Sequence, residues 1–221
     1  MAKNTSRIKN RAVKQPAAPS SKRGQKRKAS ILAAATTLFL KNGYGETSVN
    51  MIIDRSGGSK ATFYSYFPTK DMLLRAVVDG IVLNREEPEL EPSEDIRTAL
   101  CTYAEQRLRI VFSRQHQALL RLIIAERTRF PDIALMYFER GPKRSHDLLV
   151  EYMRELQERG LLDIESAAES AEFFIGMLLH QWYISELFLH SASPTPNAMR
   201  QRADHVVGRF LEAFRKPAEN R

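Results

Sequence analysis

Hydroxyl-bearing and cationic side chains cluster around the Gly57-Gly58 pair, and no acidic residue occurs between Gly57 and Lys70. Such groups donate hydrogen bonds to phosphate oxygens and to base edges, so the chemistry that they could perform is recognition of a nucleic acid. From their position and polarity we expect base or groove contacts from Ser59, Lys60, Ala61, Thr62 and Tyr64, and phosphate contacts from Thr47, Ser48, Tyr66 and Lys70.

Two short helices joined by a glycine turn would position these side chains. Thr47 can cap a first helix, whose apolar residues recur at helical spacing until Gly57-Gly58 ends it. Ser59 can cap a second helix from Lys60 to Phe67, which Pro68 cannot continue. This pattern predicts a helix-turn-helix unit whose second helix lies in the DNA major groove. A polar helix exposed to solvent, with its two phenylalanines in the core, is the alternative.

The stretch from Ile31 to Leu74 resembles the TetR family of bacterial transcriptional regulators. The resemblance rests on I-L-A-A-A-T-T-L-F, N-G-Y-G-E-T-S-V and S-G-G-S-K-A-T-F-Y-S-Y-F-P-T-K-D-M-L-L, in that order. Gly58 departs from the family pattern, which usually has Val or Ile there to pack the turn, and this departure affects the pose of Ser59 and Lys60. The resemblance implies a homodimer with a helical second domain that binds a small-molecule effector.

The positive charge is concentrated at the N-terminus. The net charge is +8, and ten of the 34 Lys and Arg residues but none of the 26 Asp and Glu residues lie at positions 1–28. We expect a disordered basic arm at residues 1–24, which either follows DNA beside the reading helix or is a solvated tail.

The remaining chain shows helical periodicity and no sustained alternation of period two, so the predicted fold class is all-α. We expect an N-terminal three-helix DNA-binding domain at residues 25–70 and a helical ligand-binding and dimerisation domain at residues 71–221. Within the second domain, Ser93 should cap a helix that runs to about Gln115, and Gly141-Pro142 should separate two further helices.

Two apolar helices close the chain. The first, from Ser166 to about His190, is apolar on nearly every side, and the second runs from Ala198 to Arg215. They could form a four-helix dimer interface, as the resemblance also implies, or they could serve only the core of one subunit. The interface candidates are Phe173, Leu178, Leu189, Val206, Phe210 and Phe214. The candidates for lining an effector pocket, which could equally be ordinary core residues, are Tyr103, Arg107, Phe112, His116, Phe174, Met177 and Trp182.

The sequence gives little support for a catalytic site or a metal site. G-G-S-K-A around Ser59 superficially resembles a nucleophile elbow, but a helix and not a strand precedes it. The five histidines lack close metal-ligand spacing; Glu186 and His190, four residues apart, could ligate a metal but are more typical of an ordinary helix pair. The single cysteine, Cys101, excludes an internal disulfide and a cysteine-based zinc site. We expect no metal and no cofactor.

The sequence therefore predicts a ligand-responsive, sequence-specific regulator that binds double-stranded DNA as a homodimer. We expect a repressor on a palindromic operator that a small-molecule effector releases, although an activator would have the same features. The chain has no apolar run long enough for a membrane span and no secretory signal, so we expect a cytoplasmic protein. A sequence-independent architectural DNA-binding protein is the alternative.

Overall fold

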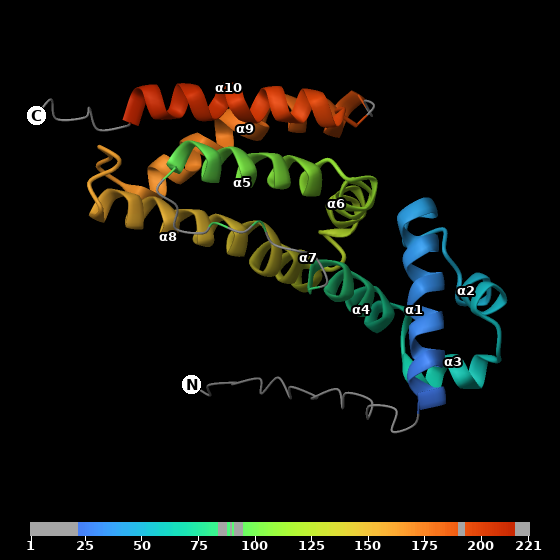
Figure 1. Ribbon diagram of the computed structural model, residues 1–221. Coiled ribbons are helices and arrows are strands. Elements are labelled where there is room, and N and C mark those ends of the chain that lie inside the picture. Colours follow the sequence, from blue (N-terminus) through green and yellow to red (C-terminus); the bar gives the residue numbers. More distant parts are fainter. Residues whose placement is uncertain (1–21, 84–87, 89, 91–94, 190–192, 215–221) are drawn as a thin grey trace, which may run out of the picture.

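The computed structural model describes residues 22–83, 88, 90, 95–189 and 193–214, and it confirms the all-α fold class. The helices follow one another in the order shown in Figure 1. They are α1 (Lys22–Asn42), α2 (Val49–Ser56), α3 (Lys60–Tyr66), α4 (Lys70–Leu83), α5 (Ile96–Val111), α6 (Arg114–Glu126), α7 (Pro131–Phe138), the π-helical turn η1 (Glu139–Lys143), α8 (Arg144–Glu158), α9 (Ala167–Leu189) and α10 (Pro196–Phe214).

The first core lies between α1, α2, α3 and α4 at one end of the molecule. Ile31 and Phe39 on α1 pack with Ile52 of α2 and Phe63 of α3, and each of these side chains is at most 1% exposed. The apolar cluster continues through α4 to residues of α6 and α7, so α4 joins this end to the rest of the chain. The division at residue 70 stays a prediction.

The second core lies between α5, α8, α9 and α10. In Figure 1 α10 runs along α5, and α8 packs against α9. The largest buried side chains are aromatic: Phe174 meets Phe210 edge to face with ring centroids 5.2 Å apart, and Tyr103 lies 6.2 Å from Phe174. Within the described ranges, no helix is both long and apolar enough to cross a membrane.

The predicted break at Gly141-Pro142 is wrong. The chain passes from α7 to α8 through η1, which contains Pro142 and buries Gly141. A π-helical turn is wider than an α-helical one, so the proline sits in a helix without the close carbonyl that a regular α-helix would place against its ring. Two ion pairs join α7 and η1 to α4: Asp132 of α7 pairs with Arg75, and Arg140 of η1 pairs with Asp79.

Three further helix limits differ from those predicted. α1 begins at Lys22, inside the predicted arm, whose residues 1–21 lie outside the described residues. Asp95 caps α5 through the N–H of Thr98, whereas the predicted cap Ser93 lies outside the described residues. α5 ends at Val111, because Ser113 caps a new helix that starts at Arg114.

Candidate nucleic-acid interface

α3 is a short helix anchored on one face by phenylalanines. The predicted cap is confirmed: the Ser59 Oγ accepts a hydrogen bond from the backbone N–H of Thr62 at 3.2 Å. Phe63 and Phe67 are 1% and 4% exposed and lie in the first core. The helix ends at Tyr66, and Phe67 is its C-cap, just before Pro68. Anchoring by two aromatic rings fixes which face of α3 points outward.

The outward face of α3 carries the predicted base-reading set. Ser59, Lys60 and Ala61 are exposed, Thr62 is half-buried, and Tyr64 is 47% exposed. The Tyr64 ring stands edge-on to Phe63, with centroids 5.2 Å apart. The structure therefore brings these five positions together on one small surface, with a hydroxyl, an ammonium and a phenol available for hydrogen bonds.

The beginning of α2 corrects one prediction. Ser48, not Thr47, is the N-cap, and its Oγ accepts from the N–H of Met51 at 3.2 Å. Thr47 is 0% exposed, and its hydroxyl donates to the carbonyl of Gly43 at 2.8 Å. Thr47 therefore holds the turn after α1 closed and is not available to a phosphate, whereas Ser48 is exposed.

Lys70 also differs from its predicted role. Its ammonium donates to the carbonyls of Tyr44 and Thr47, both at 2.7 Å, and lies 4.0 Å above the Tyr44 ring. Burial, followed by the nearby charge of Arg129, lowers the pKa of Lys70. Burial and a hydrogen bond to Asp71 raise the pKa of Tyr44. Lys70 thus ties the loop between α1 and α2 to the first turn of α4.

The turn between α2 and α3 is completed by a side chain from α1. Gly57 and Gly58 have positive φ values of 79° and 89°, a conformation that favours glycine. The Arg27 Nη1 donates to the carbonyl of Ser56 at 2.6 Å. A Cβ added at Gly58 would lie 2.3 Å from the Arg27 Nη2, so the guanidinium fills the space that a side chain at position 58 would take.

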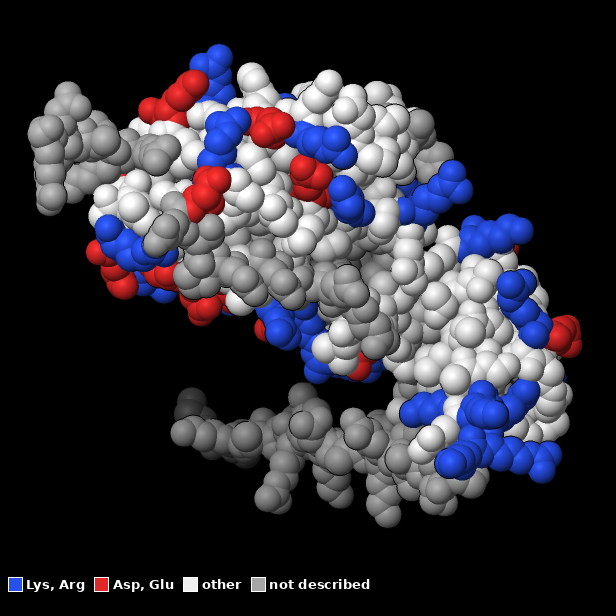
Figure 2. Space-filling model, viewed as in Figure 1, with Lys and Arg blue, Asp and Glu red and all other residues white. Residues whose placement is uncertain are grey.

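A surface hollow of about 630 Å³ lies beside this turn. Its lining includes cations and hydroxyls from two helices: Arg23, Lys26, Arg27 and Ser30 of α1, and Thr62 and Tyr66 of α3. Figure 2 shows Lys and Arg side chains gathered over this end of the molecule, where α1 begins beside α3. Of the lining residues, Arg23 falls in the predicted arm at residues 1–24, whereas Lys26 and Arg27 fall in the predicted domain at residues 25–70 but not in the set expected to contact DNA.

At the opposite end, α9 exposes a row of apolar residues. Phe173, Ile184 and Phe188 are 55%, 41% and 80% exposed, and with Met177 they recur at helical spacing along one face. Of the predicted interface residues, only Phe173 lies on this face. Leu189 is exposed but is turned about 100° from Phe188 around the helix.

The other interface candidates lie inside one subunit. Leu178, Val206 and Phe210 are at most 3% exposed and pack in the second core of one subunit, apart from the exposed face of α9, so their contact with a second subunit stays a prediction. Phe214 is half-buried and stacks on Phe210 with centroids 4.9 Å apart. The sequence missed Ile184 and Phe188, because a helix that is apolar on every side does not reveal which face its own subunit covers.

The predicted pocket residues are spread through the second core. Tyr103, Phe112 and Phe174 are at most 3% exposed, and Phe112 stands edge-on to the half-buried Trp182. Met177 is half-buried on α9. Two polar candidates contact other helices: the buried Arg107 donates to the Ser145 Oγ at 2.8 Å, and His116 lies 3.4 Å from the Tyr137 hydroxyl.

The residues considered for metal or thiol chemistry have ordinary surroundings. Glu186 pairs with Arg121 of α6 at 3.3 Å, while His190 lies outside the described residues. The Cys101 thiol donates to Asp204 at 3.5 Å, and burial and this hydrogen bond raise its pKa to about 11. Cys101 is therefore a protonated thiol at neutral pH, as expected of a small core residue and not of a nucleophile.

Comparison with protein families identifies both halves of the chain. Residues 31–77 match the model described as bacterial regulatory proteins of the tetR family, and residues 98–216 match the model of the AefR-like transcriptional repressor C-terminal domain. The HTH-type transcriptional regulator UidR of Escherichia coli K12 is 30% identical over 155 residues, which cover 63% of this chain and 72% of UidR.

Two solved structures are similar over most of the chain. A TetR-family regulator from Mesorhizobium loti superposes with a TM-score of 0.76 at 25% identity, covering 89% of this chain and all of the other. The flavonoid-responsive regulator FrrA superposes with a TM-score of 0.72 at 28% identity, covering 88% of this chain and all of FrrA. The similarity therefore extends through the second core as well as the helix-turn-helix.

Proposed function

The chain belongs to the TetR family of helix-turn-helix transcriptional regulators, and we propose that it is a dimeric repressor whose palindromic operator is released by a small-molecule effector. It is a regulator and not an enzyme. The match of the second domain to a repressor model supports the proposed sign of regulation. Since its target is bacterial DNA, we place the protein in the cytoplasm.

The observation that carries the proposal is the outward face of α3. Phe63 and Phe67 hold the helix against the core, so Ser59, Lys60 and Tyr64 face outward without a competing partner element. We propose that these residues, with Ala61 and Thr62, contact base edges or the groove wall, and that Ser48 and Tyr66 contact phosphate. Thr47 and Lys70 are left out of this set, because both are engaged with backbone carbonyls.

We propose that the exposed apolar face of α9 forms the dimer contact. Phe173, Ile184 and Phe188 present a row of large side chains that would bury apolar area against the same row of a second copy. A two-fold axis at this end would set two α3 helices in successive major grooves, about 34–36 Å apart, so the operator would be a palindrome. With about eight phosphates contacted, the logarithm of the affinity should fall with a slope near −7 against the logarithm of salt concentration.

We propose that the effector binds in the second domain. FrrA, which is similar over nearly the whole chain, is flavonoid-responsive. The candidates for effector contact remain the polar and aromatic residues of α5, α6 and α9, with Arg107 and His116 as hydrogen-bond donors. Effector binding must favour one separation of the two α3 helices, with a coupling of about 1–3 kcal/mol to the DNA site.

Selection of bound sequences from a random DNA pool at about 150 mM salt tests this function. Enrichment of a palindrome with half-sites about one helical turn apart is the expected result. Affinity without any enriched sequence would favour the alternative, a sequence-independent architectural protein. Adding candidate small molecules to the complex with the selected operator then tests release, and transcription from a promoter containing that operator distinguishes repression from activation.

A further inference from the structure

We propose that the hollow between α1 and α3 binds one phosphate of the DNA backbone beside the bases that α3 reads. This inference rests on the proposed function, since it takes the exposed face of α3 as the surface that meets DNA. It adds a site formed mainly by α1, a helix that contributes no residue to the set predicted from the sequence to contact DNA. The ligand chemistry is a phosphate monoanion, which DNA or free phosphate could supply.

The charge of the hollow favours an anion. Arg23, Lys26 and Arg27 line it from α1, and its lining contains no acidic residue. Arg23 and Lys26 are exposed, so their long side chains can move to meet a phosphate. Arg27 is held in the wall of the hollow by its hydrogen bond to Ser56 and has further N–H donors on the same guanidinium.

Hydroxyl groups complete the donor set. Thr62 and Tyr66 of α3 lie in the lining, as does Ser30 of α1, whose hydroxyl donates to the carbonyl of Ser56 at 3.3 Å and so is not counted as a donor to phosphate. Phosphate oxygens accept hydrogen bonds from such hydroxyls as well as from cations, and contacts of this kind fix the register of a protein on the duplex. Because Thr62 and Tyr66 belong to α3, a phosphate bound here would connect α1 directly to the reading helix.

Gly58 keeps the hollow open. Any side chain at this position would collide with the Arg27 guanidinium, since even a Cβ would lie 2.3 Å from the Arg27 Nη2. The guanidinium would then have to leave its place at the wall of the hollow. Because residue 58 has no side chain, the Arg27 guanidinium can occupy this space and place a cation there.

The test removes charge from the hollow without touching the turn. In Arg23→Gln/Lys26→Gln, both altered residues are exposed, so thermal unfolding should not change. Lys41→Gln is the matched control, because Lys41 is an exposed cation in the last turn of the same helix. Affinity is measured by fluorescence anisotropy over a salt series. Loss of one phosphate contact per subunit should flatten the slope of a dimer by about two, while Lys41→Gln leaves it unchanged.

Neutral backbone positions in the DNA then locate the contact. A methylphosphonate placed once in each half-site should weaken binding of the unaltered protein by about tenfold at the contacted position. The double variant should lose nothing further at that position, since the charges that met this phosphate are already gone. If the fold losses in affinity caused by the double variant and by the methylphosphonate multiply at every position, the hollow does not bind a backbone phosphate and the proposal is overturned.

Two further measurements distinguish a failure of the phosphate site from a failure of the proposed function. Salt slopes on a random duplex test the hollow even if no operator is found, because phosphate contacts do not depend on sequence. If the double variant has an unchanged salt slope and the protein still selects a well-defined operator, the hollow is not a phosphate site but the proposed function stands. Saturable binding of inorganic phosphate by the DNA-free protein, together with an unchanged DNA slope in the double variant, would assign the hollow to free phosphate instead. If the double variant unfolds, Lys26→Gln alone serves for the same measurements.

Discussion

α3 and α9 both expose aromatic side chains, but the neighbours of these side chains differ. Around Tyr64 on α3 the exposed residues are hydroxyl-bearing, cationic or small, whereas Phe188 on α9 belongs to a row with Phe173 and Ile184. An isolated aromatic ring among polar groups suits a base or a sugar, and a row of aliphatic and aromatic groups suits another apolar protein surface. The comparison teaches that exposed hydrophobic area alone does not identify a partner; the groups beside it do.

The largest effect should follow from breaking the apolar face of α9. Phe188→Glu would place a carboxylate in the proposed subunit contact, where burial of an unpaired charge is costly. We expect a monomer by sedimentation velocity, with operator affinity lowered by about 10²–10⁴-fold because the two reading helices no longer bind as one unit. Leu135→Glu on α7, where the native side chain is 55% exposed, is the control and should remain dimeric. A dimer of unchanged affinity in Phe188→Glu would exclude this face as the contact.

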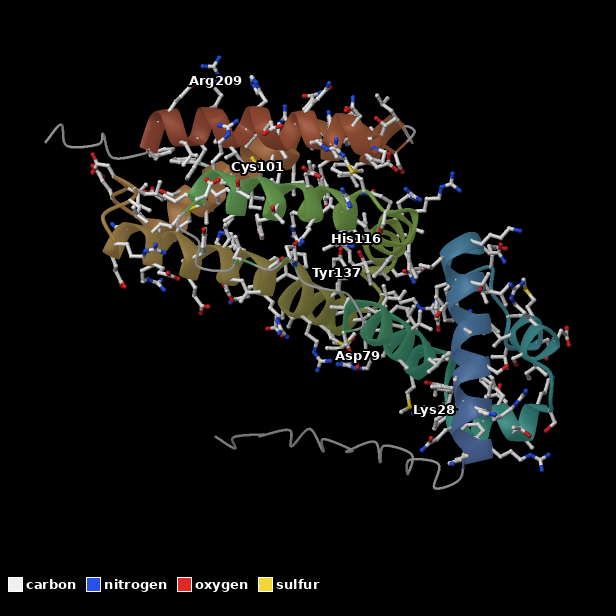
Figure 3. All side chains as sticks on the ribbon, viewed as in Figure 1. Lys28, Asp79, Cys101, His116, Tyr137 and Arg209 are labelled. Carbon is white, nitrogen blue, oxygen red and sulfur yellow. The ribbon has the colours of Figure 1, made fainter. Side chains whose placement is uncertain are left out.

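The next largest effect should come from the polar face of α3. Lys60→Gln removes an exposed cation from the proposed reading surface and should cost about 1–3 kcal/mol for each lost base contact. We expect weaker binding and relaxed preference at one operator position, measured on base-substituted duplexes, with an unchanged melting temperature. Arg209→Gln is the control, because Arg209 lies on α10, at the far end of the molecule from Lys28 on α1 (Figure 3). Uniform weakening across all duplexes would instead make Lys60 a phosphate contact.

Lys70 should affect stability more than DNA binding. Lys70→Met would leave the carbonyls of Tyr44 and Thr47 without their donor, at a cost of about 1–3 kcal/mol in the free energy of unfolding. Urea denaturation measures this loss, and the salt slope of DNA binding should not change. If Lys70→Met instead flattens the salt slope at unchanged stability, Lys70 contacts a phosphate, as the sequence predicted.

The smallest effect should be a pH dependence in the second core. The pKa of Cys101 is raised from 9.0 to about 11, so between these values the unfolded chain loses the thiol proton while the folded protein keeps it. The free energy of unfolding should therefore fall as pH rises through this window. Cys101→Ser removes this contribution, and urea denaturation across the window should show a shallower decline than in the unaltered protein. Identical declines would mean that Cys101 is as accessible to solvent as an unfolded thiol.

The sequence was most informative where local chemistry alone determines the structure. Ser59 caps α3 and Gly43 follows α1 with a positive φ, because a hydroxyl before a helix and a glycine after one satisfy backbone groups locally. Helical spacing of apolar residues likewise predicted the helix before the glycine turn, which is α2. These features led to the helix-turn-helix and to the exposed positions on α3 without any knowledge of distant contacts.

The predictions that failed depend on contacts between distant parts of the chain. Thr47 and Ser48 carry the same group, and only the fold decides that Thr47 is enclosed while Ser48 caps α2. Nothing in the sequence indicated that the Lys70 ammonium donates to two backbone carbonyls, because these lie 26 and 23 residues away in the chain. In α9 and α10 the sequence could not separate the faces that pack inside one subunit from the faces that are exposed, so it offered Leu178 of α9 and both Val206 and Phe210 of α10, all of them buried, as contact candidates.

Arg27 and Gly58 have a consequence for how this turn can change during evolution. The two residues are far apart in sequence but share one volume, so each limits the substitutions that the other position tolerates. A side chain introduced at position 58 would displace the guanidinium while the arginine is present, and at a φ of 89° it would still be strained after residue 27 had become smaller. Replacing the arginine from α1 by a side chain of the turn itself therefore requires two changes, more room beside residue 27 and a different backbone conformation at residue 58.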